Sequence, residues 1–193
     1  MSTIKYLLSL LLLSFSYTQI QYGDSPKYLI DVMDVKIHNV DHAKKIENNL
    51  HPMVLQYAYE YEVNVDIIKE AKRVYSSDLV TYYYAVKSIG AKSLGLVFDV
   101  FNLTENSKLF IYNQDRSMYI GSFNSKNNNI SGSLETAVVK GEKVIIELTV
   151  PKKEIPALKL VLGSIMHDYI DLMNLHGNKN SERVDCNDNV ACS

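Results

Sequence analysis

Two cysteines near the C-terminus are the first residues whose type suggests chemistry. Cys186 and Cys192 are the only cysteines in the 193 residues, and five residues separate them. In an exported chain two cysteines usually form a disulfide, which here would close a small surface loop. Because both lie at the end of the chain, a second alternative is that each pairs with a cysteine outside it. A zinc site is not expected, since zinc needs about four ligands and no paired histidines lie nearby.

A serine, a histidine and an aspartate also occur close together. Ser164, His167 and Asp168 have the residue types of a nucleophile, a base and an orienting acid. If this stretch is a strand, Ser164 and His167 point to opposite faces, because side chains alternate along a strand. The pattern therefore favours a strand-edge histidine beside a solvated aspartate, and no catalytic residue is predicted.

Two further groups have metal-ligating residue types. On a helix, His38 and His42 would share a face with Asp41 beside them, but no further strong ligand is predicted there. Oxygen-bearing side chains gather near predicted strand ends, at Asp99, Asn102, Asn113, Asp115 and residues 127–129. Such groups bind Ca²⁺ in some loops, although Asn and Asp are also common turn residues. Calcium stays an alternative, and no other metal or cofactor is predicted.

The tyrosines bear on carbohydrate binding. The chain has 14 Tyr and no Trp, and Tyr82, Tyr83 and Tyr84 are consecutive, so they cannot all line one groove. Most of the tyrosines are therefore expected in the core or at its rim.

The composition limits the class of protein. Apolar residues make up 47%, and 20 basic against 22 acidic residues give a net charge of −2. These values are typical of a globular domain and exclude a disordered chain. A nucleic-acid binder is not expected either, because it needs a large excess of Lys and Arg.

The first 18 residues have the pattern of an export signal. Lys5 is followed by an apolar run from Tyr6 to Phe15, which is too short for a membrane span of about 20 residues. Small residues at positions 16 and 18 predict cleavage after Thr18. We therefore expect a secreted protein, extracellular or periplasmic, without a membrane span once the signal is removed.

The rest of the chain alternates mainly with the period of strands. Asp41 and Asp66 are expected to cap short helices over 41–49 and 66–74. Strands are predicted at 57–65, 79–89, 93–101, 108–112, 118–123, 134–139, 143–150 and 158–169. The pattern predicts a mainly β fold, an antiparallel β-sandwich of jelly-roll type with a small mixed N-terminal segment.

Four regions follow from these patterns. The signal peptide covers 1–18, and a weakly patterned segment partly packed on the sandwich covers 19–77. The sandwich core covers 78–170, and a polar linker with the start of a further segment covers 171–193.

Several stretches resemble a known N-terminal region. They are Ala91–Leu103, Lys108–Asn113, Ile120–Phe123, Gly132–Ala137, Lys140–Glu147 and Ile165–Tyr169, with the Asn-rich loop among them. Together they are similar to the pro-region of secreted bacterial trypsin-like serine endopeptidases of the lysyl endopeptidase type. The resemblance covers about residues 60–192.

The resemblance implies a protease domain after this region. In that family the mature protease begins near a cysteine pair spaced like Cys186 and Cys192, and those cysteines pair with cysteines of the catalytic body. This chain ends at Ser193, so no catalytic residue is carried over and no activity is expected from it alone. We expect a truncated fragment of a longer serine endopeptidase, or a standalone relic of the pro-region.

The expected function is therefore that of a non-catalytic pro-region whose partner is a cognate serine protease domain. Lys179 and Arg183, just before the cysteines, are candidate processing sites, or alternatively ordinary solubilising charges. A different class of function, an exported binding module for a glycan or a surface protein, is the second alternative. An active hydrolase is disfavoured by the strand geometry around His167.

Overall fold

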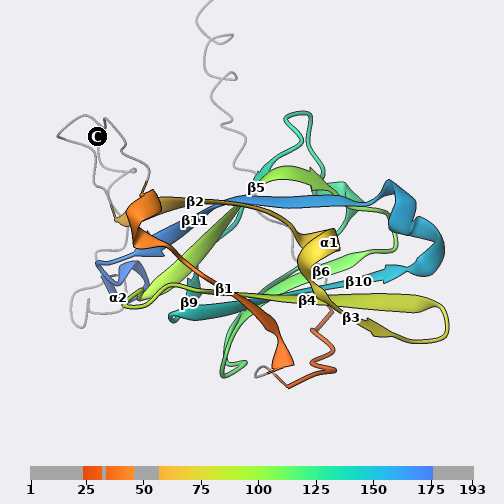
Figure 1. The fold of residues 1–193 in the computed structure, drawn as a ribbon, viewed down its shortest axis with the longest axis horizontal. Helices are drawn as coiled ribbons and strands as arrows, with labels where there is room; N and C mark the ends of the chain where they lie inside the picture. Colours follow the sequence, from red (N-terminus) through yellow and green to blue (C-terminus); the bar gives the residue numbers. More distant parts are fainter. Residues whose placement is uncertain (1–23, 32–33, 46–56, 176–193) are drawn as a thin grey trace, which may run out of the picture.

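Two mostly antiparallel β-sheets make up the protein. The structure is a computed structural model that describes residues 24–31, 34–45 and 57–175 (Figure 1). The six-stranded sheet has the order β1 (Lys36–Asn39), β4 (Leu79–Lys87), β10 (Lys143–Pro151), β6 (Lys108–Asn113) and β7 (Tyr119–Phe123), and β3 (Lys72–Tyr75) also pairs with β4. The five-stranded sheet has the order β2 (Ala58–Asp66), β11 (Lys159–Asp168), β5 (Ser93–Asn102) and β8 (Leu134–Glu135), and β9 (Val139–Lys140) also pairs with β5. A mainly β fold is thereby confirmed.

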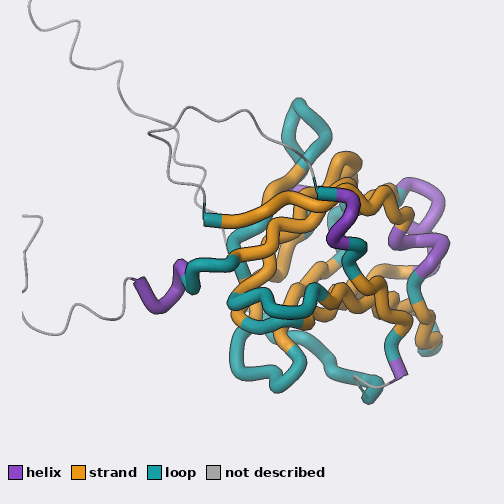
Figure 2. The backbone as a smooth tube through the Cα atoms, turned by 60° about the vertical axis from the view of Figure 1, so that its left-hand side comes forward, coloured by secondary structure: helices purple, strands orange, loops and turns teal. Residues whose placement is uncertain are grey.

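Helices are short and lie at the periphery, as Figure 2 shows in purple. The described residues form two α-helical turns, α1 (Ile67–Glu70) and α2 (Leu172–Leu175). They also form three 3₁₀ segments, at His42–Lys44, Ser125–Asn127 and Lys152–Ala157. In the described part of the chain, none of the helices has the length and hydrophobicity that a membrane crossing requires.

The main core fills the space between the two sheets. Alternate residues of β4, β10, β5 and β11 point into it, and many of them are fully buried, as Leu96, Phe98, Ile146 and Leu162 are. Burying one such side chain contributes about 1.5–3 kcal/mol. The alternating pattern in the sequence is the cause of this layer, since it gives each strand one apolar face.

A second, smaller apolar cluster lies on the outer face of the six-stranded sheet. Its buried members are Val35, Tyr83, Ala85, Phe110, Tyr112 and Ile145. Residues 24–31, which we call the strap, cover this face and contribute Tyr28 and Ile30 to the cluster. In Figure 1 the strap (red) lies below the six-stranded sheet, on the side away from the five-stranded sheet. Because both faces are covered, β4 is buried at every position from 80 to 86.

Both predicted caps exist, but the helices are shorter than expected. Asp41 accepts the backbone N–H of Ala43, and Asp66 accepts those of Ile68 and Lys69. The predicted helix over 66–74 is wrong after Glu70, because β3 follows at once and pairs with β4. Backbone pairing along the edge of β4 outweighs the helical spacing of the apolar residues there.

Among the described residues before 78, three strands belong to the two sheets. β2 pairs with β11 along nearly its whole length, and β3 and β1 share one edge of β4. β1 was not predicted. It pairs in parallel with residues 84–87 over four residues, and most of its side chains are exposed, so the sequence gives it no apolar alternation.

Candidate functional site

The most unusual side chain in the described structure is a buried glutamate on the outer face of the six-stranded sheet. β10 places Glu147 beside Tyr83 of β4 and Phe110 of β6, its direct neighbours across the sheet. Glu147 is 0% exposed. Its Oε1 accepts the backbone N–H of Lys27 at 2.6 Å, and its Oε2 accepts that of Tyr28 at 3.1 Å. A carboxylate of the sheet therefore binds the main chain of the strap.

Tyr83 continues this contact by one residue. Its hydroxyl oxygen accepts the backbone N–H of Leu29 at 3.1 Å. Three consecutive N–H groups of the strap thus donate to two side chains of the sheet, Glu147 and Tyr83. A buried N–H without an acceptor is costly, so these contacts fix the path of the strap.

Burial dominates the electrostatics of this group. It raises the pKa of the Glu147 carboxyl, although the hydrogen bonds from the Lys27 and Tyr28 amides and from the Tyr112 hydroxyl act in the opposite direction. The pKa values of the Tyr83 and Tyr112 phenols are also raised, first by burial and second by the Glu147 charge. Both phenols are therefore neutral hydrogen-bonding groups at ordinary pH.

Other residues hold the two ends of the strap. At one end Asp24 forms an ion pair with Lys108. At the other end the guanidinium of Arg116 lies 4.8 Å from the centre of the Tyr28 ring and donates to the Ile30 carbonyl at 3.2 Å. The Tyr28 ring meets Tyr112 edge-on, with ring centres 4.9 Å apart.

Three lysines surround a concavity of about 420 Å³ beyond that second end. Lys87 and Lys143 are directly opposite each other in β4 and β10, and Lys140 of β9 is the third. Burial lowers the pKa of Lys143, Lys87 lowers it further, and Asp31 of the strap acts in the opposite direction. Asp115 and Glu142 also line this concavity, so its charges are mixed, and the acidic end of the strap acts on Lys143.

A second polar cluster closes one end of the core between the sheets. Ser88 Oγ lies 2.7 Å from His167 Nδ1 and 3.2 Å from His42 Nε2. The His42 ring stacks on Tyr61 with ring centres 5.0 Å apart. Burial, and then the charge on His42, lower the pKa of His167. Ser88 itself is fully buried, so this serine–histidine pair does not present a nucleophile to solvent.

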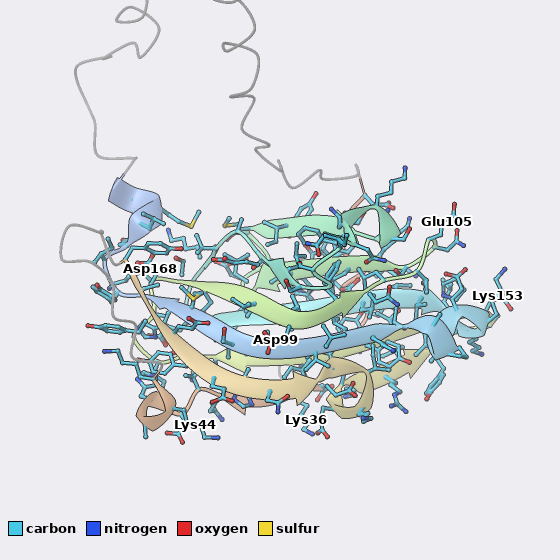
Figure 3. The ribbon with its side chains drawn as sticks, turned by 90° about the horizontal axis from the view of Figure 1, so that it is seen from above. Lys36, Lys44, Asp99, Glu105, Lys153 and Asp168 are labelled. Atoms are coloured by element: carbon cyan, nitrogen blue, oxygen red, sulfur yellow. The ribbon has the colours of Figure 1, made fainter. Side chains whose placement is uncertain are left out.

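Asp168 is a third buried polar group, at the end of β11. It is 0% exposed, so the predicted solvated aspartate is wrong. Its carboxylate accepts the Ser93 hydroxyl at 2.7 Å and the backbone N–H groups of Ile170, Asp171 and Leu172 at 2.9 to 3.0 Å. Figure 3 shows Asp168 at the end of the sheets, beside α2. The carboxylate fixes the point at which the chain leaves the sheets.

The structure does not bring Ser164, His167 and Asp168 together. Ser164 donates to Glu60 at 2.6 Å on the outer face, whereas His167 points to the core. Asp168 is directly opposite Ser93, and His167 is directly opposite Leu94, so the two neighbours face opposite sides. The geometry of β11 thus keeps His167 apart from Ser164 and Asp168.

The predicted metal-ligating groups are also separate. His38 lies in β1, where burial and then Lys44 lower its pKa, while Asp41 caps the turn that carries His42. Within residues 24–31, 34–45 and 57–175, no group of three or more His, Cys, Asp or Glu side chains could hold a metal ion.

The oxygen-bearing residues considered for calcium bind the chain itself. Asn102 donates to the Ala157 carbonyl, Asn128 donates to that of Leu103, and Asp115 accepts from Ser117. Asp99 lies near the middle of the five-stranded sheet (Figure 3), at a bulge opposite Gly163. A side chain at position 163 would overlap the Asp99 carboxyl, so this exposed carboxyl would have to move aside.

Glu147 was missed by the sequence analysis, although one signal was present. It is the one charged residue within the run Val144–Val150, whose other members are apolar except Thr149. An isolated charge in a strand that is buried on both faces needs a partner.

The residues predicted to be processed or cross-linked, Thr18, Lys179, Arg183, Cys186 and Cys192, lie outside the described residues. No model of a known protein family matches the chain, and no solved structure matches it.

Proposed function

We propose that the chain is a secreted, non-catalytic β-sandwich of jelly-roll type that serves as the pro-region of a serine protease of the lysyl endopeptidase type. The stretches that carry this resemblance coincide with β5, β6 and β7, with most of β10 and with the end of β11. They therefore supply strands to both sheets, the central β10, β6, β11 and β5 together with β7 at one edge.

The observation that carries the proposal is the fixed exit of the chain at Asp168. Four hydrogen bonds to this carboxylate hold residues 170–172 against β5 and β11. The segment similar to the start of the mature protease, Cys186–Cys192, comes after a polar linker. The chain leaves the sheets at a defined place, and this place limits the surface that a domain downstream of the linker could reach.

The Ser88 cluster supports a non-catalytic role. A nucleophilic serine must reach its substrate, and its base must be oriented by a third group. Ser88 is buried, two imidazoles contact its hydroxyl, and Asp168 lies on the other face of β11 from His167. These contacts close the end of the core.

The test is assisted refolding. The mature body of a lysyl-endopeptidase-type protease is unfolded in urea and diluted with or without an equimolar amount of this chain. Recovered active sites are then counted with an active-site titrant. We expect the chain to raise the initial rate of recovery about tenfold, which corresponds to a change in barrier of about 1.4 kcal/mol, and to hydrolyse no lysyl amide by itself. An unrelated β-protein is the control.

Two results would contradict the proposal. One is a recovery that stays at the level of the control at a molar excess of the chain. The other is hydrolysis by the chain alone that Ser88→Ala abolishes, which would make the Ser88 cluster catalytic. Binding to immobilised glycans without any effect on the protease would favour the binding module instead.

A further inference from the structure

We propose that the outer face of the six-stranded sheet is a binding site for a polypeptide segment, and that the strap is a displaceable occupant of it. We call this site the cradle. It consists of Tyr83, Phe110, Tyr112, Ile145 and Glu147, with Lys108 and Arg116 at its rim. The ligand is a peptide with an aromatic residue and carboxylates toward its ends, the chemistry that the strap presents. This inference does not depend on the pro-region role.

The polar anchors of the cradle contact the main chain of its occupant. Glu147 accepts two backbone N–H groups, Tyr83 accepts a third, and Arg116 donates to a backbone carbonyl. Every residue except proline supplies the same N–H group. These anchors therefore select the backbone path and register of the strap, in which Tyr28 has a φ of +50°, and tolerate many side chains.

Side-chain selection is concentrated at one residue. The Tyr28 ring lies against Tyr112 and under Arg116, so an aromatic ring at this position gains an edge-on contact and a cation–π contact. The next side chain, Leu29, is 52% exposed, and the one after it, Ile30, packs partly on the cluster. The cradle thus favours an aromatic residue, then any residue, then an aliphatic one.

Charge complementarity extends along the occupant. The strap begins with Asp24 and ends with Asp31. Lys108 pairs with Asp24, and at the other end Asp31 acts on Lys143, beside Lys87, in a concavity that Asp115 and Glu142 also line. A peptide with carboxylates at these two positions meets a lysine at each end of the cradle.

Some features of the strap favour its replacement by another segment. Residues 24–31 form no strand, and the Asp24–Lys108 pair is about half exposed. Tyr28 has a φ of +50°, a conformation that residues other than glycine adopt at a cost. Departure of the strap would also rehydrate Glu147, whose burial opposes its charged form. Each of these features lowers the barrier to exchange.

The experiment uses a fluorescent synthetic peptide of residues 24–31 and the full chain, with binding measured by fluorescence anisotropy. The strap of the wild-type chain competes with the peptide. Tyr28→Ala in the chain weakens that competitor and leaves the cradle intact, so we expect the peptide to bind this variant about tenfold more tightly than the wild type.

Backbone recognition is tested in the Tyr28→Ala chain. A peptide with N-methyl groups on the amides equivalent to Lys27 and Tyr28 cannot donate to Glu147, and we expect it to bind about tenfold more weakly. Glu147→Gln in the chain weakens the unmodified peptide similarly. Glu62→Gln, an exposed glutamate of the five-stranded sheet, is the matched control and changes nothing. Tyr83→Phe, which removes one acceptor, replaces Glu147→Gln if that variant does not fold.

Three outcomes would overturn the inference. The first would be a peptide that binds neither the wild-type chain nor the Tyr28→Ala chain. The second would be an N-methylated peptide that binds as well as the unmodified one. The third would be a loss of binding in Glu62→Gln as large as that in Glu147→Gln, because the peptide would then bind elsewhere on the surface.

Discussion

Glu147 and Asp168 are both fully buried carboxylates, and each binds backbone N–H groups of a segment near one end of the described chain. They differ in the distance along the sequence. Glu147 holds amides 119 and 120 residues away, whereas Asp168 holds amides two to four residues away. The local contact forms with β11 itself. The distant contact needs the assembled sheet, and it restrains the segment that we propose to be displaceable.

Removal of Asp168 should have the largest effect. Asp168→Ala leaves the Ser93 hydroxyl and three backbone N–H groups without their acceptor, and we expect a loss of about 3 kcal/mol in the free energy of unfolding. Urea unfolding followed by circular dichroism measures it. Asp99→Ala, at an exposed carboxylate, is the control, with a change of about 0.5 kcal/mol or less. Equal losses in the two variants would contradict a structural role for Asp168.

Removal of Glu147 should cost less. Glu147→Ala leaves two strap amides without an acceptor but also removes a buried charge, so we expect a loss of about 1–2 kcal/mol. Hydrogen exchange measured by NMR should show faster exchange at residues 27–29 and unchanged exchange at 170–172. If exchange accelerated at both segments, the two carboxylates would not be independent.

Glu147 and His167 should change the stability of the fold in opposite directions as the pH falls. The folded-state pKa of Glu147 is raised above 4.5, so protonation favours the folded state as the pH falls toward 4.5. The folded-state pKa of His167 is lowered below 6.5, so stability is lost as the pH falls below 6.5. Unfolding free energies between pH 7.5 and 4.5 should fall more steeply in Glu147→Gln than in the wild type, and less steeply in His167→Asn. Parallel curves for all three proteins would be inconsistent with these shifts.

The ion pair at the end of the strap should matter least. Lys108→Met removes the partner of Asp24, and we expect a change of about 0.5 kcal/mol or less that disappears at high salt. The same urea titrations at low and high ionic strength measure it. A salt-independent loss above 1 kcal/mol would show that Lys108 acts through packing instead.

The strands that pack on the main core could be predicted from the sequence, because their apolar residues alternate with the period of a strand. This holds for β5 and β6, whose predicted and observed limits differ by about one residue. Long-range contacts could not be predicted in this way. Nothing near Glu147 in the sequence indicates that residues 27 and 28 cover it, and nothing near Asp168 indicates that Ser93 and the next turn bury it.

The edge of β4 shows the same limit. Residues 72–74 have helical spacing, yet they form β3, since β4 offers unpaired backbone groups at positions 80–83. β1 completes that edge over residues 84–87. Such pairing depends on which segment reaches the edge in three dimensions, and periodicity carries no information about it.

The division of this edge between two short strands has a consequence for self-association. β3 runs antiparallel to β4 and β1 runs parallel to it, and each covers only four residues. A foreign strand approaching this border would meet two brief templates of opposite polarity instead of one long ladder. Growth of fibrils by strand addition requires a continuous template, so this border is a poor place for it to begin.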